Sequence, residues 1–136
     1  MASPCARDKA SRHDGHVTAR LTELVLDARD PEALAAFWCE VLGWSVLDRY
    51  DGQVEIGPAG GWDGPTLVFL PSDDPKTQKL RLHLDLRPDG GDHAAELERV
   101  LSLGARPADL GQGDVAWAVL TDPEGNEFCL LHPVPD

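Results

Sequence analysis

The fold of this chain is decided by LVLDARDPEALAAFWCEVLG, residues Leu24–Gly43, in which an alternating apolar segment runs directly into a helical one. Asp30 is a suitable N-cap, Pro31 fits the first helical position, and Gly43 is a typical helix end. The stretch therefore predicts a strand over Leu21–Asp27 and a helix that packs on it. The apolar side chains of this helix form one stripe at helical spacing, made of Leu34, Phe37, Trp38, Val41 and Leu42.

The same order of elements occurs a second time along the chain. The phrase L-x-L-D-x-R is found in LVLDAR, Leu24–Arg29, and again in LHLDLR, Leu82–Arg87, and both helical segments that follow end at Leu-Gly. A β-α-β-β-β order that occurs twice indicates an internal duplication, and it predicts an α+β fold of two modules. The strand candidates after the helices are WSVLDRY, QVEIG and TLVFL in the first half and ARPADL, VAWAVLT and EFCLLHP in the second.

One strand of the second half carries an unusual number of polar side chains. In LRLHLDLR, Leu80–Arg87, the leucines at 82, 84 and 86 are expected to pack against the second helix. The alternate side chains then point to the other face of the sheet. A curved sheet whose concave side forms a wet cup explains them, and a solvated sheet face is the alternative. These polar residues are Arg81, His83, Asp85 and Arg87.

The chain length of 136 residues is enough for one domain with a hydrophobic core. We expect a disordered arm over residues 1–19 and a single domain over 20–135. Within it, module one covers about 20–72 and module two about 79–134.

The composition excludes several classes of partner. A net charge of −12 gives no counterion release on nucleic acid and no attraction to anionic membranes, so neither is expected as a partner. No apolar stretch approaches the roughly 20 residues needed to span a bilayer. The cysteines Cys5, Cys39 and Cys129 are odd in number and follow no export signal, which favours reduced thiols in a cytoplasmic protein.

The duplicated modules, together with DPEALAAFWCEVLGW, RLHLDLR and DPEGNEF, resemble the vicinal oxygen chelate (VOC) superfamily. Its members include glyoxalase I, extradiol dioxygenases and bleomycin-type resistance proteins. Within it, the chain looks like the glyoxalase-like domain subgroup of actinobacterial type, over roughly Leu21–Pro133. The resemblance implies two tandem βαβββ modules that form a curved mixed sheet around a cup, a homodimer, and a small organic molecule as ligand or substrate.

In the metal-dependent members of this superfamily, a divalent ion is held in the cup by the first and last strands of each module. The matching positions of module two are His83 and Cys129. In module one, counting back from the helix end reaches Glu23, whereas aligning the L-x-L-D-x-R phrases reaches Val25. The last strand of module one offers Leu70 or Phe69 there, and neither can bind a metal.

The ligand set is therefore short by one, and we expect a site without a cofactor. The alternative is one divalent ion, zinc, nickel, iron or manganese, bound by Glu23, His83 and Cys129. Cys129 has two further interpretations, a nucleophile with His83 as its base and a half-buried structural thiol. His83 itself has a simpler interpretation as a histidine that is hydrogen-bonded near Asp85.

Two functions from different classes follow from the resemblance. The first is a lyase, isomerase or oxygenase that acts on a substrate with adjacent oxygens, with His83 and Glu23 as catalytic residues. The second is binding of a metabolite or antibiotic without chemistry, as in bleomycin-type resistance proteins. In both, the ligand is expected in the cup. The side chains predicted to line it are Asp85, Arg87, Cys129, Trp62 and Trp117.

Overall fold

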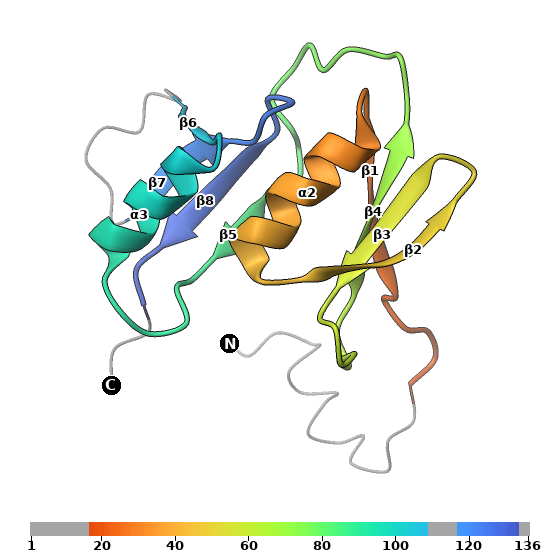
Figure 1. Ribbon diagram of the computed structural model, residues 1–136, viewed down its shortest axis with the longest axis horizontal. Helices are drawn as coiled ribbons and strands as arrows, with labels where there is room; N and C mark the ends of the chain where they lie inside the picture. Colours follow the sequence, from red (N-terminus) through yellow and green to blue (C-terminus); the bar gives the residue numbers. More distant parts are fainter. Residues whose placement is uncertain (1–16, 109–116, 134–136) are drawn as a thin grey trace.

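The structure, a computed structural model, describes residues 17–108 and 117–133. Most of the predicted arm of residues 1–19 thus lies outside the described residues. The β-α-β-β-β order occurs twice, as the duplicated phrase predicts (Figure 1). Module one comprises β1 (Glu23–Ala28), α2 (Pro31–Leu42), β2 (Ser45–Tyr50), β3 (Gln53–Gly57) and β4 (Thr66–Pro71). Module two comprises β5 (Leu84–Leu86), α3 (His93–Ser102), β6 (Arg106–Pro107), β7 (Trp117–Thr121) and β8 (Glu127–Leu131).

Each module forms its own mixed four-stranded sheet, in the orders β1-β4-β3-β2 and β5-β8-β7-β6. The first strand of each module is parallel to the last, and the other neighbours are antiparallel. The α+β fold of two βαβββ modules is thereby confirmed. Its strands make two sheets that are not closed into one, because the described strands β1 and β5 each pair on one side only.

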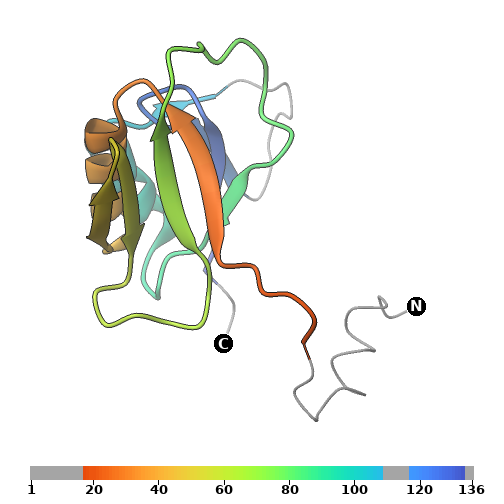
Figure 2. The ribbon, with the colours of Figure 1, turned by 90° about the vertical axis from the view of Figure 1, so that its right-hand side faces the viewer.

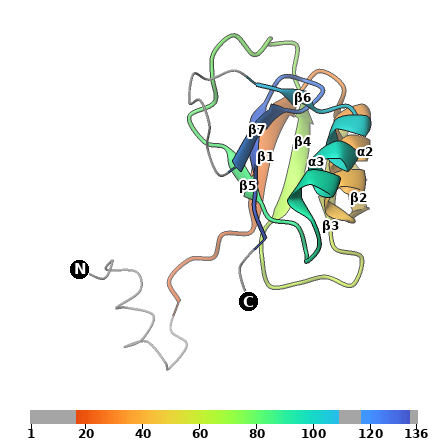
Figure 3. The same cartoon turned by 90° about the vertical axis from the view of Figure 1, so that its left-hand side faces the viewer.

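Both helices lie on the same side of the sheets (Figure 3), and the linker between β4 and β5 arches over the opposite, open side (Figure 2). The predicted stripe of α2 is confirmed, since Leu34, Phe37, Trp38 and Val41 are buried. The rings of Trp38 and Phe128 lie 4.8 Å apart, so the modules share one core. In α3 only Val100 is buried. Neither α2 nor α3, the helices of the described residues, has the length and apolar character of a membrane span.

The N-terminus of α2 is bound by the second module. In the turn between β7 and β8, the Glu124 carboxylate accepts hydrogen bonds from the backbone N–H groups of Arg29 and Asp30, at 2.7 and 2.9 Å. Asp30 also caps the helix, because its Oδ1 accepts from Ala33 N at 3.1 Å. Backbone donors at a helix N-terminus lack partners within the helix and favour negative charge, so Glu124 stabilises this junction.

The C-terminus of α2 is bound by module two as well. The Arg99 guanidinium of α3 donates to the carbonyl oxygens of Glu40 and Val41 at 3.0 and 2.9 Å. The last carbonyls of a helix have no partner within the helix, so this contact satisfies groups that would otherwise face water. Arg99 is oriented by Glu96, whose carboxylate lies 2.7 Å from its Nε.

Between these ends, a buried carboxylate joins α2 to the β7–β8 turn. Asp122 is 2% exposed, and its Oδ2 accepts from Trp38 Nε1 at 3.1 Å. Its Oδ1 accepts from the backbone N–H groups of Glu124 and Asn126, and the Asn126 amide also donates to the carboxylate. The DPEGN turn, Asp122–Asn126, therefore ties the two modules together.

The strand predicted over Leu80–Arg87 is shorter than expected, because β5 covers only Leu84–Leu86. Leu84 and Leu86 are half-buried against the shared core, and the polar alternates are exposed, as strand alternation predicts. Leu82 was expected to pack against the second helix, and this is wrong, since it is 61% exposed. The chain has not yet joined β8 at this point, so no pairing holds Leu82 against the core.

We expect Asp122→Ala to lower the free energy of unfolding by about 2–4 kcal/mol, because it leaves the buried Trp38 and Asn126 donors without an acceptor. The matched control is Asp48→Ala, at an exposed aspartate of β2, for which we expect a change within about 0.5 kcal/mol. Urea unfolding of both variants measures the difference. Equal stabilities of the two variants would contradict the structural role of Asp122.

Candidate functional site

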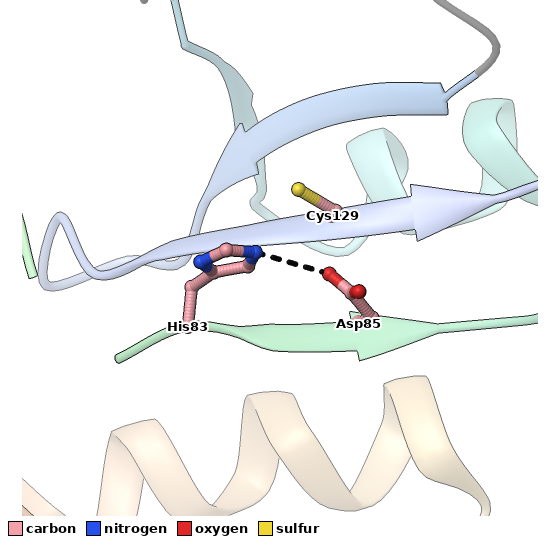
Figure 4. Close-up of side chains that lie close together, drawn as sticks. All are labelled: His83, Asp85 and Cys129. Atoms are coloured by element: carbon pink, nitrogen blue, oxygen red, sulfur yellow. Dashed lines mark ion pairs between the residues drawn. The ribbon is translucent and has the colours of Figure 1, made fainter. Parts of the chain in front are cut away.

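Three side chains of module two come together on the open side of its sheet (Figure 4). Asp85 lies in β5, and the parallel register places it opposite Cys129 of β8. His83 stands just before β5, and its side chain points to the same side as that of Asp85 (Figure 4). His83 Nε2 lies 3.2 Å from Asp85 Oδ1, and the ligand atoms of all three residues lie within 4.8 Å of one another.

The environment keeps the Cys129 thiol protonated. Burial raises the pKa of the thiol, and so do the nearby charge of Asp85 and the hydrogen bond from the thiol to it, while Lys79 has a smaller opposing effect. The thiolate is the nucleophilic form of cysteine, and this site disfavours it. The geometry thus supports a hydrogen-bonded thiol more than a nucleophile.

A hollow of about 260 Å³ lies beside this cluster, in the seam between the two sheets. Leu24, Val25 and Leu26 of β1 all line it. Alternate residues of a strand point to opposite faces, so a hollow lined by all three must lie at the strand's edge. The other edge of β1 is paired with β4, and the hollow therefore occupies the free edge that faces β5. Its second wall comes from the β5 side and is made of Leu80, Leu82, His83 and Leu84. Its third wall comes from the core and is made of Trp38, Leu67 and Phe128.

The acidic groups that line the hollow already have partners. Asp122 is held by Trp38 and Asn126, and Glu127 accepts from Lys76 Nζ at 3.0 Å and from Leu80 N at 3.1 Å. Burial alone would raise the pKa of Glu127, but the hydrogen bonds from Leu80 and Lys76 prevail and lower it. Glu127 thus holds the inter-module linker, and Leu80 with it, against the seam. Sequence reasoning missed Glu127, since nothing in the sequence pattern pairs it with a lysine of the linker.

Glu23, predicted to act with His83, lies elsewhere on the open side. It lines a separate hollow of about 190 Å³ with Asp48 and Tyr50, and it is not part of the His83 cluster. The strand register explains this position. Asp27 pairs with Leu70 as Asp85 pairs with Cys129, so the modules correspond in the frame of the L-x-L-D-x-R phrase. In that frame the counterpart of His83 is Val25, and a catalytic role of Glu23 stays a prediction.

The other residues predicted to line the cup have different surroundings. Arg87 donates through Nη1 to the His132 carbonyl at 2.7 Å, beyond the end of β5. The ring of Trp62 packs edge-on against Trp44 at 5.6 Å, and Trp62 lines neither the seam nor the hollow beside Glu23. The backbone of Trp117 begins β7, but its side chain lies outside the described residues.

The cluster has the donor types of a metal site. Zinc accepts imidazole nitrogen, carboxylate oxygen and thiolate sulfur, and catalytic zinc sites use three protein ligands and one open position. His83, Asp85 and Cys129 supply one donor of each kind. In module one, Val25 and Leu70 stand at the positions of His83 and Cys129 and supply no donor, and only Asp27, at the position of Asp85, supplies a carboxylate. In the structure, Asp85 lies beside His83 and Cys129, at the place where Glu23 was predicted as the third ligand.

Two βαβββ modules that carry a polar cluster on their open side are the architecture of the VOC superfamily. Residues 23–131 match the family described as "Glyoxalase-like domain". The chain belongs to this glyoxalase-like domain family, within the VOC superfamily, as its sequence motifs predicted. A comparison with curated proteins finds no match.

Solved structures with the same fold are distant in sequence. A glyoxalase/bleomycin resistance protein/dioxygenase family enzyme from Burkholderia phytofirmans PsJN has a TM-score of 0.66 at 19% identity, covering 85% of this chain and 100% of that one. The fosfomycin resistance protein FosX from Listeria monocytogenes, complexed with Mn(II) and sulfate, has a TM-score of 0.65 at 15% identity, with 88% and 93% covered. The antibiotic binding protein TnmS3 from Streptomyces sp. CB03234 has a TM-score of 0.55 at 23% identity, with 88% and 100% covered. At these identities the likeness shows the fold alone.

We expect Asp85→Asn to speed up alkylation of Cys129 by iodoacetamide at a fixed pH near neutrality. The substitution removes the charge that raises the thiol pKa, and each pKa unit changes the thiolate fraction by about tenfold. Peptide mass spectrometry follows the reaction at each cysteine. Cys39 is the internal control, because burial and Glu40 raise its pKa and Asp85 does not. An unchanged rate at Cys129 would show that Asp85 does not control the thiol.

Proposed function

We propose that this protein binds a small organic molecule in the seam between its modules, with the polar end of the molecule at His83 and Asp85. One observation carries this proposal: the seam hollow is lined mostly by apolar side chains, and His83 belongs to its wall while also bonding Asp85. Ligand sites are typically concave and mainly apolar, with a few convergent polar groups.

The His83–Asp85 pair favours an enzyme that moves a proton on its substrate. The Asp85 carboxylate lies 3.2 Å from His83 Nε2, where it orients the imidazole ring. An imidazole placed in this way can take a proton from a carbon or hydroxyl group of the bound molecule. A lyase, isomerase or oxygenase acting on adjacent oxygens is the reaction class that the family resemblance implies.

Binding without chemistry is the second candidate function, and the hydrophobes of module one favour it. Val25 and Leu70 stand at the counterparts of His83 and Cys129, so module one retains only Asp27, the counterpart of Asp85, in this frame. TnmS3, which shares the fold, is an antibiotic binding protein. In this function the His83–Asp85 pair would fix the orientation of the ligand by hydrogen bonds.

A divalent ion would be held by His83, Asp85 and Cys129, whose donor types fit zinc. It would supply Lewis-acid polarisation of a bound oxygen. We propose a site that works without this ion, because Val25 and Leu70 leave the usual four-position set half empty. The predicted homodimer and cytoplasmic location also stay proposals. Exposed Tyr50 and Trp62 offer apolar surface that a second chain would cover.

The test uses His83→Ala with His132→Ala as the matched control, because His132 is also exposed but lines neither the seam nor the hollow beside Glu23. Melting temperatures are measured against a panel of small organic molecules that includes catechols, 2-hydroxy acids and 2-hydroxy ketones. A compound at 100 times its Kd stabilises the folded state by about 2.7 kcal/mol, a shift that is easily detected. We expect at least one compound to stabilise the wild type and His132→Ala but not His83→Ala.

The same preparations, purified without chelator, are analysed for metal. We expect well below one ion per chain in all three proteins. Stoichiometric metal that is lost in His83→Ala and kept in His132→Ala would contradict the metal-free proposal. If no compound stabilises the wild type, or if the compounds stabilise His83→Ala equally, small-molecule binding at His83 is wrong.

A further inference from the structure

The seam hollow limits the chemistry of its ligand, and the following inference rests on the proposed function. Trp38 and Phe128 at its floor are each 1% exposed, and Leu67 beside them is 6% exposed. Burying apolar ligand surface against such groups is favourable in proportion to the area removed from water. A polar group placed there would lose its hydration without gaining a partner, because the nearby Asp122 is already bonded to Trp38 and Asn126.

The charge around the hollow disfavours an anionic ligand. Among the described residues, those that line it include Asp122 and Glu127 but no lysine or arginine. Lys76, which is close by, is engaged with Glu127 at 3.0 Å. An anion would therefore face two carboxylates without a cation in the wall, while the protein as a whole carries a net charge of −12. A cation would have to compete for carboxylates that are already satisfied.

The volume of the seam hollow suits a small ring system, and a second hollow of about 650 Å³ adjoins it along Val25, Leu26 and Leu80. A cavity of roughly 150 Å³ accepts benzene, whereas sites for drug-sized ligands start near 300 Å³. The seam, at about 260 Å³, lies between these sizes. It suits a bicyclic molecule better than a single ring or an extended polycyclic one.

Polar groups that remain open to a ligand come from His83 and from the edge of β1, because Asp122, Asn126 and Glu127 are already engaged with one another or with neighbouring residues. His83 lines the seam, and the free edge of β1 adds backbone groups. The carbonyl groups of Thr22 and Ala28 accept hydrogen bonds from Thr66 and Ser72, on the β4 side. Since backbone groups alternate along a strand, the N–H and C=O of Val25 point away from β4 and toward the seam. A hydroxyl or carbonyl group of the ligand would find a donor and an acceptor at this position.

We infer that the seam binds a neutral, predominantly apolar molecule of about two fused rings, with one hydroxyl or carbonyl group directed to His83 and the edge of β1. Such a ligand buries its rings against Leu24, Leu84 and the core and leaves its single polar group at the rim. This assigns a ligand class to the seam and separates it from the polar hollow beside Glu23.

The probe is 2-naphthol, and naphthalene-2-sulfonate is the matched ligand with the same rings and a negative charge. Isothermal titration calorimetry of the full chain measures both. We expect 2-naphthol to bind one site per chain and the sulfonate to bind roughly tenfold or more weakly. The binding heat capacity is expected to be negative, because apolar surface is buried.

Two variants place a larger side chain in the seam without disturbing the core. Leu82→Trp and Val25→Trp alter lining residues that are 61% and 52% exposed. Leu47→Trp is the control, at a 42% exposed leucine of β2 that does not line the hollow. We expect 2-naphthol affinity to fall about tenfold or more in the first two variants and to stay unchanged in the control. Urea unfolding checks that all three are folded.

The inference is overturned if 2-naphthol does not bind the wild type, if the sulfonate binds equally well, or if the tryptophan variants of the seam bind like Leu47→Trp. These failures are distinguishable from a failure of the proposed function. A compound whose stabilising effect depends on His83, together with no 2-naphthol binding, would leave the proposed function standing and remove the assigned ligand class. If no compound stabilises the protein through His83 and 2-naphthol does not bind, the proposed function and the assigned ligand class are both wrong.

Discussion

The hydrogen bond between the buried Asp122 carboxylate and Trp38 is the contact on which the relative position of the two modules depends. The two sheets share no backbone pairing between the described strands β1 and β5, so the usual means of fixing neighbouring strands is missing here. Module two instead holds helix α2 of module one: at its middle through Asp122, at its N-terminus through Glu124, and at its C-terminus through Arg99. The width of the seam is therefore set by side chains on the helix side of the molecule.

This arrangement explains why a hollow persists between the two strands. Unpaired strand edges are usually covered or paired, since they present free backbone groups to solvent or to other chains. Here the linker partly covers the seam, and Glu127 holds it there by bonding Lys76 and the Leu80 backbone. The edges stay far enough apart for a small molecule to occupy the space. The same groups that stabilise the fold thus shape the site.

The sequence predicts the elements of this fold well, because they depend on local patterns. The caps of α2, its apolar stripe and the repeated L-x-L-D-x-R phrase all depend on residues close in the chain, and the family resemblance adds the duplicated architecture. The polar face with His83 and Asp85 is also predicted, since strand alternation determines it. The seam itself is not predicted, because it arises from how two finished modules pack. Leu82 shows the limit: alternation assigns it to the core, but the chain joins β8 only from Leu84 onward.

The separation of Glu23 from His83 also depends on strand pairing, which the sequence alone does not determine. Two alignments of module one were open from sequence, and the parallel register of β1 with β4 favours the one in which Val25 corresponds to His83.

The central claim, that a small molecule occupies the seam, is tested most directly by methyl NMR on protein saturated with 2-naphthol. The account predicts intermolecular NOEs from the ring protons to the Leu24 and Leu84 methyl groups. NOEs confined to Val68, which lines the hollow beside Glu23, would contradict it.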